Sequence, residues 1–188
     1  MSRSPVDATT IPLSVNARGK PWSVVDRMLR GKPVIVHGDG TGLWTTTHNT
    51  DFAKGFVGLI GNPAAVGQAV HITSDEVLTW DEHYRTVAAA AGAPEPQLVH
   101  LPSELIGAWE PPRLGSLLGD KAWSAIFDNA KIRALVPGYA ATTRFRDGIS
   151  QTLDHFRDDP RLREVDDAFD RWCDELMGAQ QQAFRRPC

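Results

Sequence analysis

Residues 31–56 read GKPVIVHGDGTGLWTTTHNTDFAKGF, and this stretch decides the fold class. The β-branched run PVIVH at 33–37 predicts a strand, and the following GDG predicts the turn that closes it. The Thr-rich run LWTTTH at 43–48 predicts a second strand. Apolar residues then recur at helical spacing, with Asp51 as a candidate N-cap. The stretch therefore predicts a strand, a turn, a second strand and a helix.

The segments on either side of this stretch continue the alternation of strands and helices. Helical spacing predicts a helix over 22–30, and a capping box of Thr79 and Glu82 predicts the start of an Ala-rich helix. The remaining predicted elements are strands at 69–73 (AVHIT) and 97–101 (QLVHL), a short helix at 102–109, a mixed helical region at 114–136 with Asp128 as a cap, and two long amphipathic helices, the second starting at Asp159-Pro160. We therefore expect an α/β protein with few short strands and a helical C-terminal region.

The composition is that of a folded domain. The chain has 188 residues, of which 41% are hydrophobic and 23% charged, values that exclude a disordered polymer. Its net charge of -3 argues against a broad nucleic-acid surface. No apolar run reaches the roughly 20 residues that span a bilayer, and the N-terminus lacks a signal-peptide pattern, so a soluble cytoplasmic protein is expected. We expect a flexible segment at 1–20, a folded region at 21–178 and a frayed tail at 179–188.

Three glycines at the end of the predicted helix have the spacing of some dinucleotide-binding loops. Gly55, Gly58 and Gly61 give G-x-x-G-x-x-G, but the phosphate-binding mechanism requires a strand before the glycines and a helix that starts at them. Here the glycines lie inside a helical pattern, and Asn62-Pro63 follows. Close packing of a helix against its neighbours is therefore the favoured interpretation, and no cofactor-binding residue is predicted.

No other motif predicts catalysis or metal binding. The six histidines have neither H-E-x-x-H spacing nor zinc spacing with cysteines, so a structural role is favoured for them. Cys173 lies next to the apolar stripe of the last helix, which favours packing over reactivity. The acidic residues of that helix are interpreted as a solvated face rather than a catalytic carboxylate pair: Asp166, Asp167, Asp170, Asp174 and Glu175.

The quoted stretch resembles part of the extended short-chain dehydrogenases/reductases, the NAD-dependent epimerase/dehydratase family. After its cofactor domain, that family has a helix, G-x-P, a strand, G-D-G, R-D-F-I-H-V-x-D-x-A and a helix. The resemblance covers about residues 20–158, and four further matches follow in order. AVHIT at 69–73 looks like the last strand of the family's main sheet, and TWDE at 79–82 looks like the start of the next helix. DNAK at 128–131 resembles the family's D-x-x-K, and RDGI at 146–149 resembles its E-G-I helix.

The resemblance implies the C-terminal, substrate-binding portion of a Rossmann-like NAD(P)-dependent oxidoreductase. In the family the N-terminal half supplies the nucleotide loop and a catalytic Tyr-x-x-x-Lys. Here Tyr84 and Tyr139 are followed four residues later by Ala88 and Thr143 instead of lysine. NAD or NADP is the cofactor of the parent family, and neither is expected to bind this chain alone. Whether the chain is an enzyme by itself stays open, and no catalytic residue is predicted.

The resemblance also implies a substrate cleft. The family's arginine after G-D-G, which contacts phosphate in nucleotide-sugar enzymes, aligns with Trp44, and tryptophan offers no charged bidentate clamp. A nucleotide-sugar substrate is therefore disfavoured. His48 and Asp51 keep matching positions and are interpreted as a strand-end hydrogen-bonding residue and an N-cap. The expected substrate-binding residues are Asn16, Trp22, Val25, Trp44 and Thr46.

Two other functional classes remain as alternatives. The first is a non-catalytic ligand-binding or interaction module, a truncated remnant that exposes an apolar face. A homodimer or a partner chain would then cover the exposed sheet. The second is nucleic-acid binding, because some relatives of the family that the chain resembles are associated with RNA. The net charge opposes it, although basic residues do cluster locally. That cluster comprises Arg18, Lys20, Arg27, Arg30 and Lys32.

Overall fold

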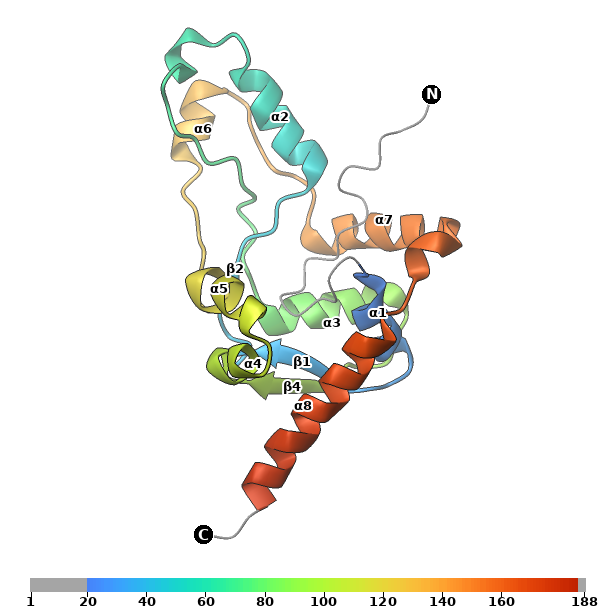
Figure 1. Cartoon of the computed structure of the whole chain (residues 1–188). Coiled ribbons are helices and arrows are strands. Elements are labelled where there is room, and N and C mark those ends of the chain that lie inside the picture. Colours follow the sequence, from blue (N-terminus) through green and yellow to red (C-terminus); the bar gives the residue numbers. More distant parts are fainter. Residues whose placement is uncertain (1–19, 186–188) are drawn as a thin grey trace.

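The computed structural model describes residues 20–185 as a mixed α/β fold in which helices predominate (Figure 1). The strands are β1 (Val34–His37), β2 (Leu43–Trp44), β3 (Leu78–Thr79) and β4 (Leu98–Leu101). The longer helices are α1 (Trp22–Leu29), α2 (Asn49–Leu59), α3 (Trp80–Ala91), α4 (Ser103–Trp109), α6 (Ala130–Leu135), α7 (Phe145–Asp158) and α8 (Asp167–Arg185). Short helical turns are η1 (Pro63–Ala65), η2 (Pro111–Arg113), α5 (Leu114–Ser116), η3 (Leu117–Lys121) and η4 (Pro160–Arg163).

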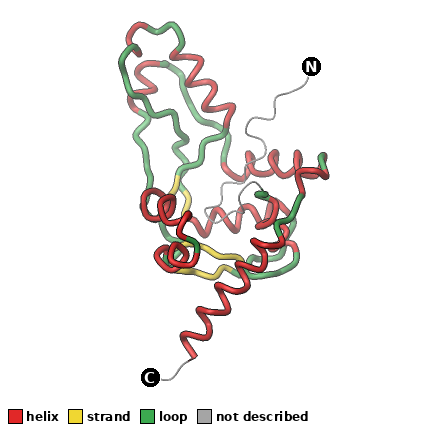
Figure 2. The backbone as a smooth tube through the Cα atoms, in the orientation of Figure 1, coloured by secondary structure: helices red, strands yellow, loops and turns green. Residues whose placement is uncertain are grey.

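The strands of the described residues form two small sheets, visible as the yellow segments in Figure 2. β1 and β4 run parallel, with Val34 opposite Leu98 and His37 opposite Leu101. β2 and β3 are antiparallel, with Leu43 opposite Thr79. A parallel pair needs a long crossover, and here α2 and α3 lie in the connection between β1 and β4. All four residues of β1 are buried, as expected for a β-branched run covered on both faces.

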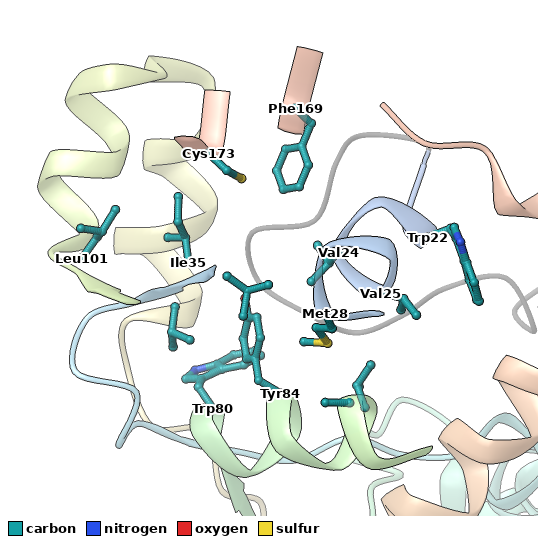
Figure 3. Close-up of a cluster of buried hydrophobic side chains, with 14 of the residues drawn as sticks. Trp22, Val24, Val25, Met28, Ile35, Trp80, Tyr84, Leu101, Phe169 and Cys173 are labelled. Atoms are coloured by element: carbon teal, nitrogen blue, oxygen red, sulfur yellow. The ribbon is translucent and has the colours of Figure 1, made fainter. Parts of the chain in front are cut away.

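The main core lies where α1, α3 and α8 converge on β1 (Figure 3). Val25, Val36 and Tyr84 have no exposed surface at this junction. Trp22 stacks on Phe156 of α7 with ring centroids 5.5 Å apart, which joins α1 to the C-terminal helices. The apolar stripes of the helices therefore meet in one core, as the helical spacing predicted.

A separate arm carries α2 and α6 away from the sheets (Figure 1). Its small core consists of Ile72, Ile132 and Tyr139. A Cβ atom on Gly55 would lie 2.6 Å from Ile72 Cγ2, and one on Gly58 would lie 3.0 Å from a methyl group of Val136. The predicted close packing of this helix is confirmed, because the missing side chains let α2 approach its neighbours.

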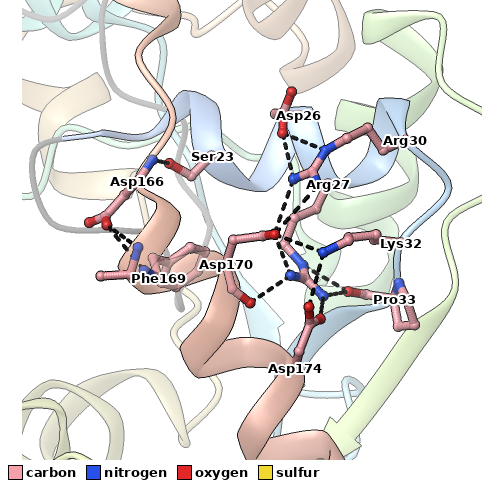
Figure 4. A network of polar contacts seen from close by, with 11 residues as sticks. Ser23, Asp26, Arg27, Arg30, Lys32, Pro33, Asp166, Phe169, Asp170 and Asp174 are labelled. Atoms are coloured by element: carbon pink, nitrogen blue, oxygen red, sulfur yellow. Dashed lines mark hydrogen bonds and ion pairs between the residues drawn. The ribbon is translucent and has the colours of Figure 1, made fainter.

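An ionic cluster joins α1 to α8 (Figure 4). The Arg27 side chain is 1% exposed, and its two terminal nitrogens donate to Asp170 Oδ1 at 2.5 Å and Asp174 Oδ1 at 2.6 Å. Arg27 Nε also donates to the Pro33 carbonyl oxygen at 3.0 Å. The interpretation of the acidic residues as a solvated face was therefore wrong for Asp170, whose side chain is 16% exposed. Asp174 is 48% exposed on that face and also pairs with the buried guanidinium.

Most sequence-based element assignments are confirmed, including the mixed α/β class, the helix at 22–30, the strands at 33–37 and 97–101 and the Thr79–Glu82 capping box. The prediction of a strand at 69–73 was wrong for residues 20–185, because this segment pairs with no described strand. The β2 strand is also shorter than predicted, since only its first two residues pair.

Three helix ends also need correction. His48, not Asp51, caps α2, since its side chain accepts from the Thr50 amide. Asn129, not Asp128, is the N-cap of α6, although Asp128 accepts from the Ala130 amide. Residues 160–163 form the turn η4, and α8 starts only at 167. The carboxylate of Asp166, the residue before the helix, accepts hydrogen bonds from the amides of Ala168 and Phe169. α8 then runs to Arg185, past the boundary at 179 predicted for a tail.

Gly58→Ala is expected to lower the free energy of unfolding by about 1–3 kcal/mol, because the added methyl group meets the Val136 side chain. The control is Gly178→Ala in α8, where the added methyl group would meet no side chain or neighbouring segment within 4 Å among the described residues, and stability should rise by about 0.5–1 kcal/mol. Urea unfolding followed by tryptophan fluorescence measures both. Equal effects of the two variants would contradict close packing at Gly58.

Asp170→Asn is expected to destabilise the chain by about 3 kcal/mol at pH 7, because it leaves Arg27 without its main carboxylate. Burial raises the pKa of Asp170, but hydrogen bonds from Lys32, Arg30 and Arg27 outweigh it and hold the pKa far below the ordinary 3.8. The stabilisation is therefore complete above pH 3.8 and is lost as the pH falls below it.

Urea unfolding from pH 7 down to pH 2 tests this dependence. Wild-type stability should fall in the acid range, and the variant should show a flatter profile. The exposed Asp147→Asn is the control and should change little, because surface ion pairs contribute little. A variant with wild-type stability at pH 7 would show that Arg27 does not depend on Asp170.

Candidate functional site

The candidate site is built on β2, where Trp44 lies over the start of α3. Its indole stacks on Trp80, with ring centroids 5.2 Å apart and planes inclined by 30°. The ammonium of Lys121 lies 5.5 Å from the centroid of the Trp44 ring, which is within cation–π distance. Trp44 is partly exposed, whereas Trp80 is 2% exposed. The site thus presents one aromatic ring supported from beneath by another.

The segment before α6 holds this strand in place. The Ala125 amide donates to the Leu43 carbonyl oxygen at 2.8 Å, and the Thr45 hydroxyl donates to the Ala125 carbonyl oxygen at 3.1 Å. Trp80 Nε1 and His37 Nε2 both donate to the carbonyl oxygen of Lys121, at 3.1 and 2.7 Å. Burial lowers the pKa of His37, so its ring is neutral at pH 7. The Trp80 ring is therefore fixed by its bond to the Lys121 carbonyl oxygen, and the strand that carries Trp44 is fixed by the bonds to Ala125.

Thr46 is oriented by a buried histidine. His83 has no exposed surface, and its Nδ1 lies 2.9 Å from the Thr79 carbonyl oxygen, to which it donates. Burial lowers the pKa of His83, so the neutral ring presents Nε2 as an acceptor to the Thr46 hydroxyl at 3.1 Å. The Thr46 hydroxyl therefore donates its proton to His83, and its oxygen can still accept a hydrogen bond from another group.

The structure brings together two of the five predicted substrate-binding residues. Trp44 and Thr46 both contact α3, through Trp80 and His83 respectively. Trp22 and Val25 belong to the main core, with exposed fractions of 8% and 0%. Asn16 lies outside the described residues. The assignment of these five residues to substrate binding stays a prediction.

The tyrosines have structural environments. Tyr84 has no exposed surface. The Tyr139 hydroxyl donates to the Thr73 carbonyl oxygen at 3.1 Å, and burial together with the charge of Asp51 raises the pKa of this phenol. A phenol that exchanges protons with a carbinol needs the opposite shift. Within residues 20–185, no group of three or more His, Cys, Asp or Glu side chains is placed to hold a metal ion.

Asp51 links the arm to the segment before α7. Its carboxylate has no exposed surface, accepts from the Thr143 amide at 2.8 Å and pairs with Lys54 Nζ at 2.6 Å. Its burial raises the pKa, but these hydrogen bonds outweigh that effect and hold the pKa below its ordinary value. Asp51 is thus a buried anion inside the first turn of α2, a role that its position in the sequence did not show.

The basic cluster is not a free cationic surface. Arg30 and Lys32 pair with Asp170 at 3.0 and 2.7 Å, and Arg27 is buried against the same carboxylate. Lys20 lies 3.5 Å from Glu164, and Arg18 lies outside the described residues. Phosphate groups would have to compete with these acidic partners, so the cluster gives no support to nucleic-acid binding.

The sequence-based predictions missed an apolar groove along α2 and η1. It has a volume of about 690 Å³, and its lining includes Phe52, Phe56, Ile60, Val66 and Val70. Large apolar side chains are exposed here: Phe56 is 52% and Val66 is 79% exposed. The signal was present in the sequence, because no charged residue occurs between Lys54 and Asp75.

Comparison with curated proteins finds two partial relatives, and no family model matches the chain. The chain is 30% identical over 112 residues to 2'-dehydrokanamycin reductase of Streptomyces kanamyceticus, covering 58% of this chain and 30% of the relative. It is 31% identical over 74 residues to the chloroplast stem-loop binding protein of 41 kDa b of Arabidopsis thaliana, covering 39% and 20%.

Solved structures match a larger share of the chain. The epimerase Mth375 of Methanothermobacter thermautotrophicus superposes with a TM-score of 0.59 and 19% identity, over 76% of this chain and 38% of that one. The UDP-glucuronic acid 4-epimerase of Bacillus cereus, solved in complex with NAD, gives a TM-score of 0.51 and 18% identity over 76% and 39%. The chain has the fold of part of an extended short-chain dehydrogenase/reductase. It spans less than half the length of these relatives.

One match to the dehydrogenase/reductase pattern has a clear structural basis. In the DNAK motif at 128–131, Lys131 Nζ donates to the Ala69 carbonyl oxygen at 2.8 Å. The Asn129 amide donates to the Thr73 carbonyl oxygen at 3.0 Å and accepts from the Thr73 hydroxyl at 3.0 Å. The motif therefore holds the 69–73 segment through side chains.

Within the described part of the chain, no helix is both long and apolar enough to cross a membrane.

Cys173 is expected to be unreactive in the folded chain. The side chain is 2% exposed, and burial raises the pKa of its thiol to about 12. In a Cys188→Ser background, a thiol reagent at pH 8 should label Cys173 only after the chain is unfolded in guanidinium, because the thiolate is the nucleophile. Rapid labelling of the native chain would instead indicate a reactive cysteine.

Proposed function

We propose that this chain forms the substrate-binding part of an NAD(P)-dependent epimerase/dehydratase-like oxidoreductase. The observation that supports this most strongly is the superposition of 76% of the chain on less than half of epimerases such as the NAD complex from Bacillus cereus. The parent reaction would be hydride transfer at a carbinol or carbonyl carbon. A cytoplasmic location is part of the same proposal.

The glycines of α2 are not arranged as a dinucleotide-binding loop. Gly55 and Gly58 lie inside α2 and pack against neighbouring side chains, whereas a pyrophosphate needs backbone amides at the start of a helix. Neither tyrosine has a lysine four residues later. In this proposal the cofactor and the proton-transferring pair belong to the rest of the fold, and this chain positions the substrate against them.

The substrate is proposed to be a sugar-like compound that carries no nucleotide. Trp44 occupies the position that the resemblance assigns to a phosphate-binding arginine, and its ring offers an apolar face instead of a charged clamp. The apolar face of a sugar ring can stack on such a surface, and the Thr46 oxygen can accept from a hydroxyl or amino group. The name of the Streptomyces relative, 2'-dehydrokanamycin reductase, points to a substrate of this class.

A non-catalytic ligand-binding or interaction module is the second candidate. It is favoured by the environments of Tyr84 and Tyr139, since both side chains are buried and the Tyr139 hydroxyl is bonded to a backbone carbonyl oxygen. Both candidates use the β2 site for the ligand. They differ in whether a complex that contains a cofactor-binding partner turns the substrate over.

Isothermal titration calorimetry of the isolated chain tests the ligand class. Kanamycin is expected to bind, while UDP-glucuronic acid and NADH give no binding heat. Trp44→Leu should weaken kanamycin binding at least tenfold, because the stacking surface is lost. Trp109→Leu is the matched control, since Trp109 is 45% exposed on α4, and it should leave affinity within twofold. Binding of UDP-glucuronic acid without kanamycin binding would contradict the proposed substrate class.

A further inference from the structure

His83 is held in one tautomer by the backbone just before its own helix. Its Nδ1 lies 2.9 Å from the Thr79 carbonyl oxygen, and a carbonyl oxygen can only accept a hydrogen bond. Nδ1 therefore carries the proton of the neutral ring. The other ring nitrogen, Nε2, then has a lone pair and no proton, so it can act only as an acceptor.

Two aromatic rings hold the imidazole in this orientation. The centroid of the Trp80 ring lies 5.5 Å from that of His83, and the Phe145 ring of α7 lies 4.5 Å away at an interplanar angle of 62°. The His83 side chain has no exposed surface. A flip of the ring would break both of its hydrogen bonds where water cannot replace them, which is costly for buried polar groups.

The Thr46 hydroxyl has a single proton, and this proton is donated to His83 Nε2 at 3.1 Å. Toward any other group the Thr46 oxygen can therefore only accept. Thr46 is partly exposed, like Trp44, and both residues contact α3, through His83 and Trp80 respectively. A ligand stacked on Trp44 would thus meet, two residues along the chain, an oxygen that accepts but does not donate.

We propose that His83 is a positioning residue that fixes Thr46 as a hydrogen-bond acceptor, so that the β2 site selects a ligand with a hydroxyl or amino group at this point. A group that can only accept, such as a carbonyl or carboxylate oxygen, would meet the lone pairs of Thr46 and be disfavoured. The inference rests on the proposed function, because it takes β2 as the ligand site.

The same geometry gives ligand binding a pH dependence. Burial lowers the pKa of His83 below its ordinary 6.5, although the bond to the Thr79 carbonyl oxygen and the charges of Glu76, before β3, and Glu82, on α3, oppose this shift. Once the ring gains its second proton, Nε2 donates to Thr46, whose own proton must turn elsewhere. Affinity for a donor group is therefore complete at pH 7 and is lost as the pH falls through the folded-state pKa, below 6.5.

Calorimetric titration of the chain with kanamycin at pH 7 tests the role of Thr46. Thr46→Val keeps the shape of the side chain but removes the acceptor, and it should weaken binding at least tenfold. Thr152→Val is the matched control on α7, where the hydroxyl donates to the Gly148 carbonyl oxygen at 3.1 Å, and it should leave the affinity within twofold.

A double-mutant cycle tests whether His83 acts through Thr46. His83→Phe should weaken kanamycin binding about fivefold in the wild-type background and less than twofold in the Thr46→Val background. His83→Gln keeps a side-chain acceptor and should restore most of the affinity. A merely structural role of His83 would instead weaken binding equally in both backgrounds.

Nitrogen-15 NMR of the His83 ring tests the tautomer without any substitution at this residue, so it holds even if His83→Phe does not fold. Nδ1 should be protonated and Nε2 unprotonated at pH 7. The kanamycin affinity of the wild type should fall over the pH range in which the ring gains its second proton, and Thr46→Val should show no such fall.

A protonated Nε2 at pH 7, additive effects of His83→Phe and Thr46→Val, or an affinity that is unchanged while the ring becomes protonated would overturn the inference and leave the proposed function intact. The proposed function fails differently. A wild-type chain that gives no binding heat with kanamycin would refute the proposed ligand class itself.

Discussion

The buried guanidinium of Arg27 is the constraint on which the rest of the fold depends. It joins α1 to α8 through Asp170 and Asp174 and also bonds the Pro33 carbonyl oxygen just before β1. A buried cation is tolerated only when its donors are matched, and here carboxylates and a carbonyl oxygen match them. α1 and the residue before β1 are thereby joined to α8, whose Asp170 lies 143 residues beyond Arg27.

The main core and the arm differ in how completely their apolar side chains are buried. The main core surrounds a parallel pair whose first strand is fully buried, and the candidate site on β2 rests on it through Trp80 and His83. The arm has a core of only three buried apolar residues and exposes large apolar side chains beside it. The candidate site is therefore held by many contacts, whereas the arm exposes an apolar groove.

Sequence patterns predicted local structure where the physical cause was local. The capping box at Thr79 and Glu82 was predicted because its two hydrogen bonds join residues three apart. The roles of Asp51 and Asp170 were not, since their partners Thr143 and Arg27 lie 92 and 143 residues away. The prediction of a strand at 69–73 was wrong for a related reason. A segment with high β-propensity forms a strand only when a neighbouring segment supplies backbone hydrogen-bond partners.

The sequence alone determined the α/β class, the glycine-lined face of α2, the absence of a Tyr-x-x-x-Lys pair and the resemblance to extended short-chain dehydrogenases/reductases, because spacing and residue type are local properties. Only the tertiary structure decided that Trp44 and Thr46 rest on α3 while Trp22 and Val25 lie in the core. It also decided that the side chains of Lys131 and Asn129, and no neighbouring strand among the described residues, hold the 69–73 segment. These contacts join residues that lie far apart in the sequence, so no local pattern encodes them.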